Sequence, residues 1–109
     1  MHELAITQGI IAAVIEHIGQ SKVTRVVIEV GALTSVAPHA VRFCFDVCAK
    51  DTNLAGAELE IVEVAGRARC RDCGDERALE SPIAWCACGS LNFDLLSGHE
   101  LKIREVEVL

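Results

Sequence analysis

The chain has 109 residues, of which 51% are hydrophobic and 4% aromatic, and its formal net charge is −6. This length allows one modest domain, or one domain that carries a small insertion. The acidic balance argues against broad binding to nucleic acid or to anionic membranes, because both need a positively charged surface.

The first twenty residues predict a cytoplasmic protein. They contain no basic segment followed by a long apolar run, and their longest aliphatic stretch, residues 10–15, is far too short to span a membrane. In a reducing compartment, the six cysteines of this chain point to metal binding rather than to disulfide bonds.

Hydrophobic periodicity predicts the elements of the first half of the chain. Residues 4–18 place isoleucines and valines at helical spacing, and residues 23–30 alternate as a half-buried strand. A loop over 31–37 leads to Pro38, which suits the first position of a helix because its missing N–H would have no helical partner there. We therefore expect a second helix over about 38–50.

Two later strands are predicted, one at 58–64 and one in the last segment of the chain, 98–109. In each, the apolar residues change from odd to even positions, and since side chains alternate between the two faces of a strand, this predicts a bulge or a twist in both. The predicted class is α+β, with a small antiparallel three-stranded sheet flanked by two helices.

Residues 66–97 differ in character from the rest, because they contain all four closely paired cysteines. They also contain four of the ten basic residues: Arg67, Arg69, Arg71 and Arg77. We expect an inserted metal-binding domain at 66–97, within a domain formed by 1–65 and completed by a strand over 98–109.

The pairs Cys70-x-x-Cys73 and Cys86-x-Cys88 suit a closed tetrahedral zinc site. A module of about thirty residues buries too little apolar surface to fold alone, so a metal would supply the missing stability. Trp85 is expected to cover the metal loop. The alternatives are an iron–sulfur cluster, a redox dithiol at the first pair, or four unconnected buried thiols.

Met1-His2-Glu3 offers a second site of different chemistry. His2 can chelate through its ring Nδ1 and its own amide nitrogen, and the terminal amine closes a further ring with that amide. A planar set of nitrogens favours nickel(II) or copper(II) over zinc. The simpler alternative is an exposed histidine that is only solvated.

Other potential ligands have simpler explanations. Cys44 and Cys48 share a helical stripe with apolar residues, so we expect them to pack in the core rather than to bind an ion. His17 falls late in the first helix, where it suits the helix dipole or solvent. No spacing rule supports His39 or His99 as an auxiliary nickel ligand.

Six motifs spread along the chain carry a family resemblance. They are Met1-His2-Glu3-Leu4, Gly31-x-Leu33-x-x-Val36-x-Pro38 followed by Val41-Arg42-Phe43, Gly56-Ala57-Glu58-Leu59, Arg69-Cys70-x-x-Cys73-Gly74, Cys86-x-Cys88-Gly89-Ser90 and Gly98-x-Glu100-Leu101. With these, the chain resembles the HypA/HybF family of nickel metallochaperones along essentially its whole length. One departure is the second cysteine pair, whose spacer commonly has two residues in the family.

The resemblance implies that Ni²⁺ is transported and that it binds at the N-terminus through Met1, His2 and the adjacent backbone, with Glu3 tuning or delivering it. It implies a zinc ribbon in which structural Zn²⁺ is held by the ligands Cys70, Cys73, Cys86 and Cys88. It also implies two partners, a GTPase of the HypB type and the large-subunit precursor of nickel–iron hydrogenase, with urease served in some organisms. A homodimer is left open.

We therefore expect a metallochaperone and not an enzyme, since the sequence has no visible catalytic constellation. The rival functions are a zinc-ribbon adaptor that binds nucleic acid or protein through the arginines of 66–97, and an iron–sulfur or dithiol redox protein.

Overall fold

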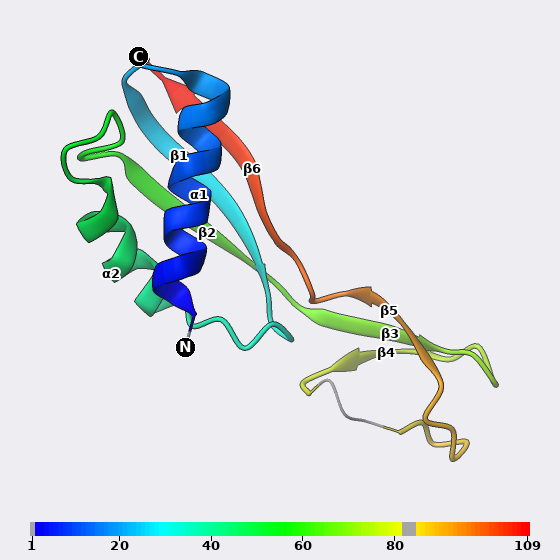
Figure 1. Cartoon of the computed structure of the whole chain (residues 1–109). Helices are drawn as coiled ribbons and strands as arrows, with labels where there is room; N and C mark the ends of the chain where they lie inside the picture. The colour runs from blue at the N-terminus through cyan, green and yellow to red at the C-terminus, as the bar shows by residue number, and fades with distance from the viewer. Residues whose placement is uncertain (1, 82–84) are drawn as a thin grey trace.

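The computed structural model describes residues 2–81 and 85–109, which form two helices and six strands. In chain order these are α1 (Glu3–Ile18), β1 (Val23–Gly31), α2 (Pro38–Ala49), β2 (Glu58–Val64), β3 (Gly66–Cys70), β4 (Glu76–Leu79), β5 (Phe93–Ser97) and β6 (Leu101–Val108). Two small sheets lie end to end in an elongated molecule with extents of 54 × 23 × 18 Å (Figure 1). Neither helix of the described part is long and apolar enough to cross a bilayer.

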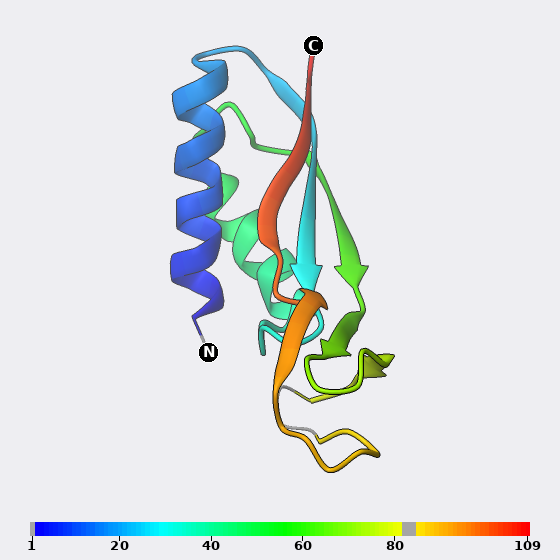
Figure 2. The same cartoon turned by 90° about the vertical axis from the view of Figure 1, so that its right-hand side faces the viewer.

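The first sheet has the strand order β2-β1-β6, and both helices cover one of its faces (Figure 2). Val26, Ile28 and Val30 alternate along β1 and are buried against Val14 of α1 and Phe45 of α2. This contact is the main hydrophobic core, and it uses the apolar face that the alternation of residues 23–30 predicts.

The opposite face of the first sheet is covered by charged side chains. The Arg25 guanidinium pairs with Glu107 at 2.9 Å, with Glu105 at 3.4 Å and also with Glu60. These side chains lie around Val27, which is only 3% exposed. Long charged side chains therefore shield the one apolar residue that β1 presents on this face.

The α+β class with two helices and a three-stranded sheet is confirmed, but the direction of one strand was predicted wrongly. β1 and β6 pair antiparallel as expected, whereas β1 and β2 pair parallel. The connection from β1 to β2 runs through α2, and a crossover through a helix returns the chain in the same direction.

The predicted bulge is present in β6 and absent from β2. Along β1, Val27 pairs with Glu105 while the next residue, Ile28, pairs with Ile103, so Arg104 is the extra residue of a bulge. The register of β2 is continuous. Its apolar positions change phase because Val62 is half-buried on the charged face of the sheet.

The second sheet has the order β4-β3-β5, and all its strands pair antiparallel. β2 leads into β3 through residue 65, and β5 leads back into β6 through residues 98–100. Among the residues that the structure describes, this sheet and its loops bury a few side chains: Ala68, Cys70, Leu79 and Cys86. Such a small apolar core contributes little stability by itself.

Three glycines allow the backbone segments between the two sheets to cross. A Cβ atom at Gly31 would lie 2.1 Å from the carbonyl oxygen of Gly98, and one at Gly98 would lie 2.5 Å from the Cα of Gly66. The Gly31 N–H donates to the Glu100 carbonyl (2.7 Å), and the Leu33 N–H donates to the Gly98 carbonyl (2.8 Å). Close backbone contacts, together with the Leu33 side chain, thus fix the junction between the two sheets.

Candidate metal centre

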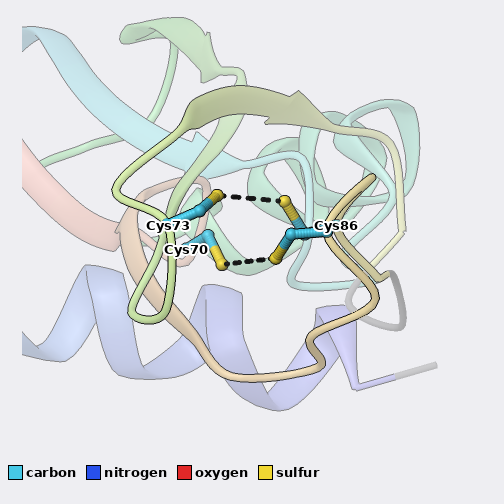
Figure 3. A group of neighbouring side chains, drawn as sticks. Cys70, Cys73 and Cys86 are labelled. Atoms are coloured by element: carbon cyan, nitrogen blue, oxygen red, sulfur yellow. Dashed lines mark hydrogen bonds between the residues drawn. The ribbon is translucent and has the colours of Figure 1, made fainter.

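The four paired cysteines come together at the end of the second sheet. Their sulfur atoms all lie within 4.8 Å of one another, with 3.7 Å between Cys70 and Cys88 and 3.5 Å between Cys73 and Cys86. Figure 3 shows Cys70 and Cys73 facing Cys86 from the opposite loop. Tetrahedral zinc with bonds of about 2.3 Å holds its sulfurs about 3.8 Å apart, so the cluster fits a single tetrahedral ion.

Each cysteine pair lies on a tight turn that a glycine closes. The Gly74 N–H donates to the Cys70 carbonyl, and the Gly89 N–H donates to the Cys86 carbonyl, both at 2.9 Å. The two glycines have positive φ angles of 76° and 92°. The one-residue spacer of the second pair therefore shortens the turn by one residue and leaves the closing hydrogen bond in place.

The clustered thiols do not ionise alike. The backbone N–H of Cys73 is the main cause that lowers the pKa of the Cys70 thiol, to about 6. The Asp75 N–H lowers the pKa of Cys73, but the neighbouring Cys86 and Cys70 thiols outweigh it and raise that pKa to about 12. Thiolates this close repel one another, so a divalent cation is what would allow the group to deprotonate together.

Three of the four arginines around this cluster form ion pairs with neighbouring carboxylates. The pairs are Arg71 with Asp94 at 2.7 Å, Arg69 with Glu76 at 3.1 Å and Arg77 with Asp75 at 4.0 Å. These carboxylates reduce the positive surface that a nucleic-acid adaptor would need.

The N-terminal residues border a hollow of about 460 Å³ at the start of α1. Met1 lies outside the described residues. His2 is exposed and immediately precedes α1, and its carbonyl accepts a hydrogen bond from the Ile6 N–H at 2.9 Å. The remaining lining comes from Glu3, Ile6, Thr34, Ser35, Val36 and Leu101. The structure therefore places His2 and Glu3 together beside this hollow. Both are distant in sequence from the four paired cysteines.

Glu3 has a structural role that the sequence interpretation missed. Its side chain is buried, and its Oε2 accepts a hydrogen bond from the Ala37 N–H at 3.0 Å. This bond is the main cause that lowers the pKa of Glu3 to about 2. Ala37 immediately precedes α2, so this bond ties the carboxylate of Glu3 to the start of that helix. No local sequence pattern signals this contact, because its two residues lie 34 positions apart.

The other candidate ligands lie apart from the cluster. The Nδ1–H of His17 donates to the Ala13 carbonyl at 3.0 Å near the end of α1, as the helix-dipole interpretation predicts. Cys48 packs against the main core and Cys44 is half-buried on the same helix. Within residues 2–81 and 85–109, the four paired cysteines are the only group of three or more potential metal-binding side chains this close together.

Trp85 does not cover the cysteine turns. Its side chain is 68% exposed, so that prediction was wrong. The Trp85 carbonyl accepts a hydrogen bond from the Arg77 guanidinium at 3.2 Å. His39 and His99 are also exposed.

Comparisons with known proteins match nearly the whole chain to one family. The family model described as hydrogenase/urease nickel incorporation, metallochaperone, hypA matches residues 1–108. The hydrogenase maturation factor HypA of Nostoc sp. is 55% identical over 108 residues, covering 99% of this chain and 96% of that protein. The HypA of Geotalea uraniireducens is 45% identical over 109 residues, covering 99% of both.

A solved structure shows the same fold. The solution structure of the Ni metallochaperone HypA from Helicobacter pylori aligns with a TM-score of 0.70 at 24% identity, covering 100% of this chain and 98% of that one. The resemblance predicted from the sequence motifs is thereby confirmed. The chain belongs to the HypA family of nickel metallochaperones, whose members act in hydrogenase maturation.

Proposed function

We propose that this protein takes up Ni²⁺ at its N-terminus, through Met1, His2 and the neighbouring backbone, and hands it on during hydrogenase maturation. The observation that carries the proposal is the position of His2, exposed at the first turn of α1 beside a hollow. Its N–H lies ahead of the helical hydrogen bonds, so a metal can replace that proton without breaking the helix.

The chemistry of such a site favours binding that can be reversed. The imidazole and a deprotonated amide suit square-planar nickel(II). The positive end of the α1 dipole opposes a cation at this position, and the anionic amide offsets that repulsion. A site with few protein ligands at a chain end can exchange its ion, as delivery requires.

Glu3 tunes this site by holding α1 in place rather than by giving its carboxylate to the metal. The hydrogen bond from Ala37 to Glu3 ties the first turn of α1 to the start of α2. Residues 31–37 thereby set the position of His2 relative to the hollow. The carboxylate also places negative charge beside the cation site.

We assign Cys70, Cys73, Cys86 and Cys88 as ligands of one structural Zn²⁺. The distances between their sulfurs and the two tight turns support this donor set. A closed thiolate site holds its ion firmly, so this zinc would stabilise residues 66–97 as a separate domain. Residues 1–65, with the strand of 98–109, would form the nickel domain.

Delivery in this proposal requires partners in the cytoplasm. A GTPase of the HypB type would act together with this chain, and the hydrogenase large-subunit precursor would receive the ion. The role in hydrogenase maturation that the family shares supports this assignment. The chain itself would act by ligand exchange and not as an enzyme.

Replacing His2 by alanine tests the nickel site. We expect His2→Ala to weaken nickel binding by more than about a hundredfold, because it removes a ligand to the metal itself. Calorimetric titration of untagged protein measures the affinity, while metal analysis and thermal melting should show unchanged zinc content and stability. His17→Ala is the matched control, since it removes an exposed histidine near the opposite end of α1. A His2→Ala protein with the nickel affinity of the parent would refute the assignment.

Two substitutions of Glu3 separate positioning from ligation. Glu3→Gln keeps an oxygen that can accept from the Ala37 N–H, whereas Glu3→Ala removes it. We expect the glutamine variant to bind nickel within about threefold of the parent, and the alanine variant to bind more weakly and melt earlier. Equal loss of nickel affinity in both variants would show instead that the carboxylate itself binds the ion.

A further inference from the structure

The four thiols of the cysteine cluster differ in how far they reach the solvent. Cys70 and Cys86, the first residue of each pair, are only 1% and 3% exposed. Cys73 and Cys88, the second residue of each pair, are exposed. Each turn therefore presents one accessible sulfur and covers the other, so a reagent dissolved in water meets Cys73 and Cys88 first.

Each exposed thiol also faces a buried thiol of the opposite turn. The sulfur of Cys73 lies 3.5 Å from that of Cys86, and the sulfur of Cys88 lies 3.7 Å from that of Cys70. Figure 3 shows both contacts running between the two turns. Sulfurs in a disulfide are about 2.05 Å apart, so a movement of less than about 2 Å would close either bond.

We propose that these two contacts make the cysteine cluster an oxidation site, at which hydrogen peroxide converts the four thiolates into two disulfides, Cys73–Cys86 and Cys70–Cys88. The site rests on the zinc assignment proposed above and is independent of the nickel site. Both bonds join one turn to the other, so they hold the turns together in place of the metal. Oxidation therefore releases zinc while residues 66–97 stay closed.

The chemistry removes two electrons from each pair of sulfurs. A zinc ligand is a thiolate, and an exposed thiolate attacks one oxygen of hydrogen peroxide; the O–O bond breaks, hydroxide leaves and the sulfur becomes a sulfenic acid. The buried thiolate that faces it then attacks this sulfur, the S–O bond breaks, and a second hydroxide leaves as the S–S bond forms. Both hydroxides take up protons and become water.

Two molecules of hydrogen peroxide are consumed for the two disulfides. A disulfide lacks the negative charge that binds zinc, so the cluster loses its ion once the first bond has formed. The second exposed thiolate is then left with its own buried neighbour, and the same two steps join them.

The two turns are anchored differently, which allows the remaining movement. Cys70 ends β3 and is paired with Phe93 of β5, so the first turn is part of the second sheet. Cys86 and Cys88 belong to no strand, and their turn is closed on itself by a hydrogen bond from the Cys86 N–H to the Ser90 carbonyl at 2.8 Å. The second turn can therefore shift as a unit toward the first.

Pairing within one turn would have a different consequence. A Cys70–Cys73 disulfide closes only the first turn and leaves the two turns unconnected once zinc has gone. The proposed bonds instead connect positions 13 and 18 residues apart in the chain. A longer closed loop removes more conformational freedom from the unfolded chain, so the bonds between turns stabilise the segment more.

Treatment of the full-length, zinc-loaded protein with hydrogen peroxide tests the proposal. Metal analysis of the untreated protein first checks the zinc assignment separately. With about a tenfold excess of peroxide, we expect the bound zinc to be released to a colorimetric indicator and the four cluster thiols to become resistant to alkylation. The Cys44→Ser/Cys48→Ser variant is the matched control, and it should release zinc like the parent because these thiols lie outside the cluster.

Trypsin separates the possible pairings, because it cleaves the unfolded chain after Arg71, between Cys70 and Cys73. The proposed bonds link both resulting peptides to the one that carries Cys86 and Cys88, and fragmentation between these two cysteines in a mass spectrometer assigns each bond. Any other pairing would overturn the proposal. So would sulfinic acids in place of disulfides, or a cluster that keeps its zinc and its free thiols.

Limited trypsin digestion of the folded protein tests the structural consequence. The oxidised, zinc-free protein should be cleaved within about fivefold of the rate of the zinc-loaded parent, whereas reduced protein stripped by a chelator should be cleaved at least about a hundredfold faster. Dithiothreitol with added zinc should restore the parent. Oxidised protein that is cleaved as fast as the stripped protein would overturn the proposal. Stripped protein that resists trypsin would instead contradict the structural role of zinc.

Discussion

Replacing Cys73 by serine should release the metal from the cysteine cluster and open residues 66–97 to protease. The described part of residues 66–97 buries so little apolar surface that the bound ion would supply most of the stability of this segment. The arginines of this segment are trypsin sites, and we expect cleavage after them to become at least about a hundredfold faster. Metal analysis should show no bound zinc, while the helical circular dichroism of α1 and α2 remains.

Cys48→Ser is the matched control for this experiment. Cys48 lies at the margin of the main core, outside the cluster, so its substitution should leave the zinc content and the cleavage pattern as in the parent. A Cys73→Ser protein that keeps one zinc per chain and resists trypsin like the parent would exclude a structural role for the ion.

The helices of the chain and the strands of its first sheet could be predicted well because local pattern determines them. The helix expected over 4–18 spans Glu3–Ile18, and the strand expected over 58–64 spans Glu58–Val64. In α1, burial of one face selects the helical period of the apolar residues. Pro38 also begins α2 as predicted, because its fixed φ suits the first position of a helix.

The direction of β2 and its regular register could not be predicted, because both depend on distant partners. The odd–even change of its apolar residues suggested a bulge, but Val62 is simply half-buried on the face where Arg25 and its carboxylates lie. Burial on two faces and a bulge give the same pattern in a single strand. Only the neighbouring strands distinguish them.

Only part of the candidate site could be predicted from the sequence, for a similar reason. The gathering of the four thiols follows from their spacing, which is local within each pair. The contact between Glu3 and Ala37 joins residues that are far apart in the chain, and no periodicity records it. The close approach of Gly31 to Gly98 is equally invisible in the sequence, where both glycines look like ordinary turn residues.

That close approach gives the second large expected effect, a loss of stability on replacing Gly31 by alanine. The new methyl group would lie 2.1 Å from the Gly98 carbonyl oxygen, and the contact is with backbone that the hydrogen bond from Leu33 holds in place. The segments cannot separate without breaking the junction between the sheets. We expect the free energy of unfolding, measured by urea denaturation of the zinc-loaded protein, to fall by about 3 kcal/mol or more.

Gly9→Ala is the control that separates the effect of the close contact at Gly31 from the general effect of adding a methyl group. Gly9 lies within α1, and a Cβ there would meet nothing within 4 Å, so alanine should raise the free energy of unfolding by up to about 1 kcal/mol through its better helix propensity. The two substitutions are chemically identical and differ only in what surrounds the added carbon. If Gly31→Ala were as stable as the parent, the segments at the junction would have to be free to move apart. Residues 31–37 could then not hold the first turn of α1 in a fixed position relative to the second sheet.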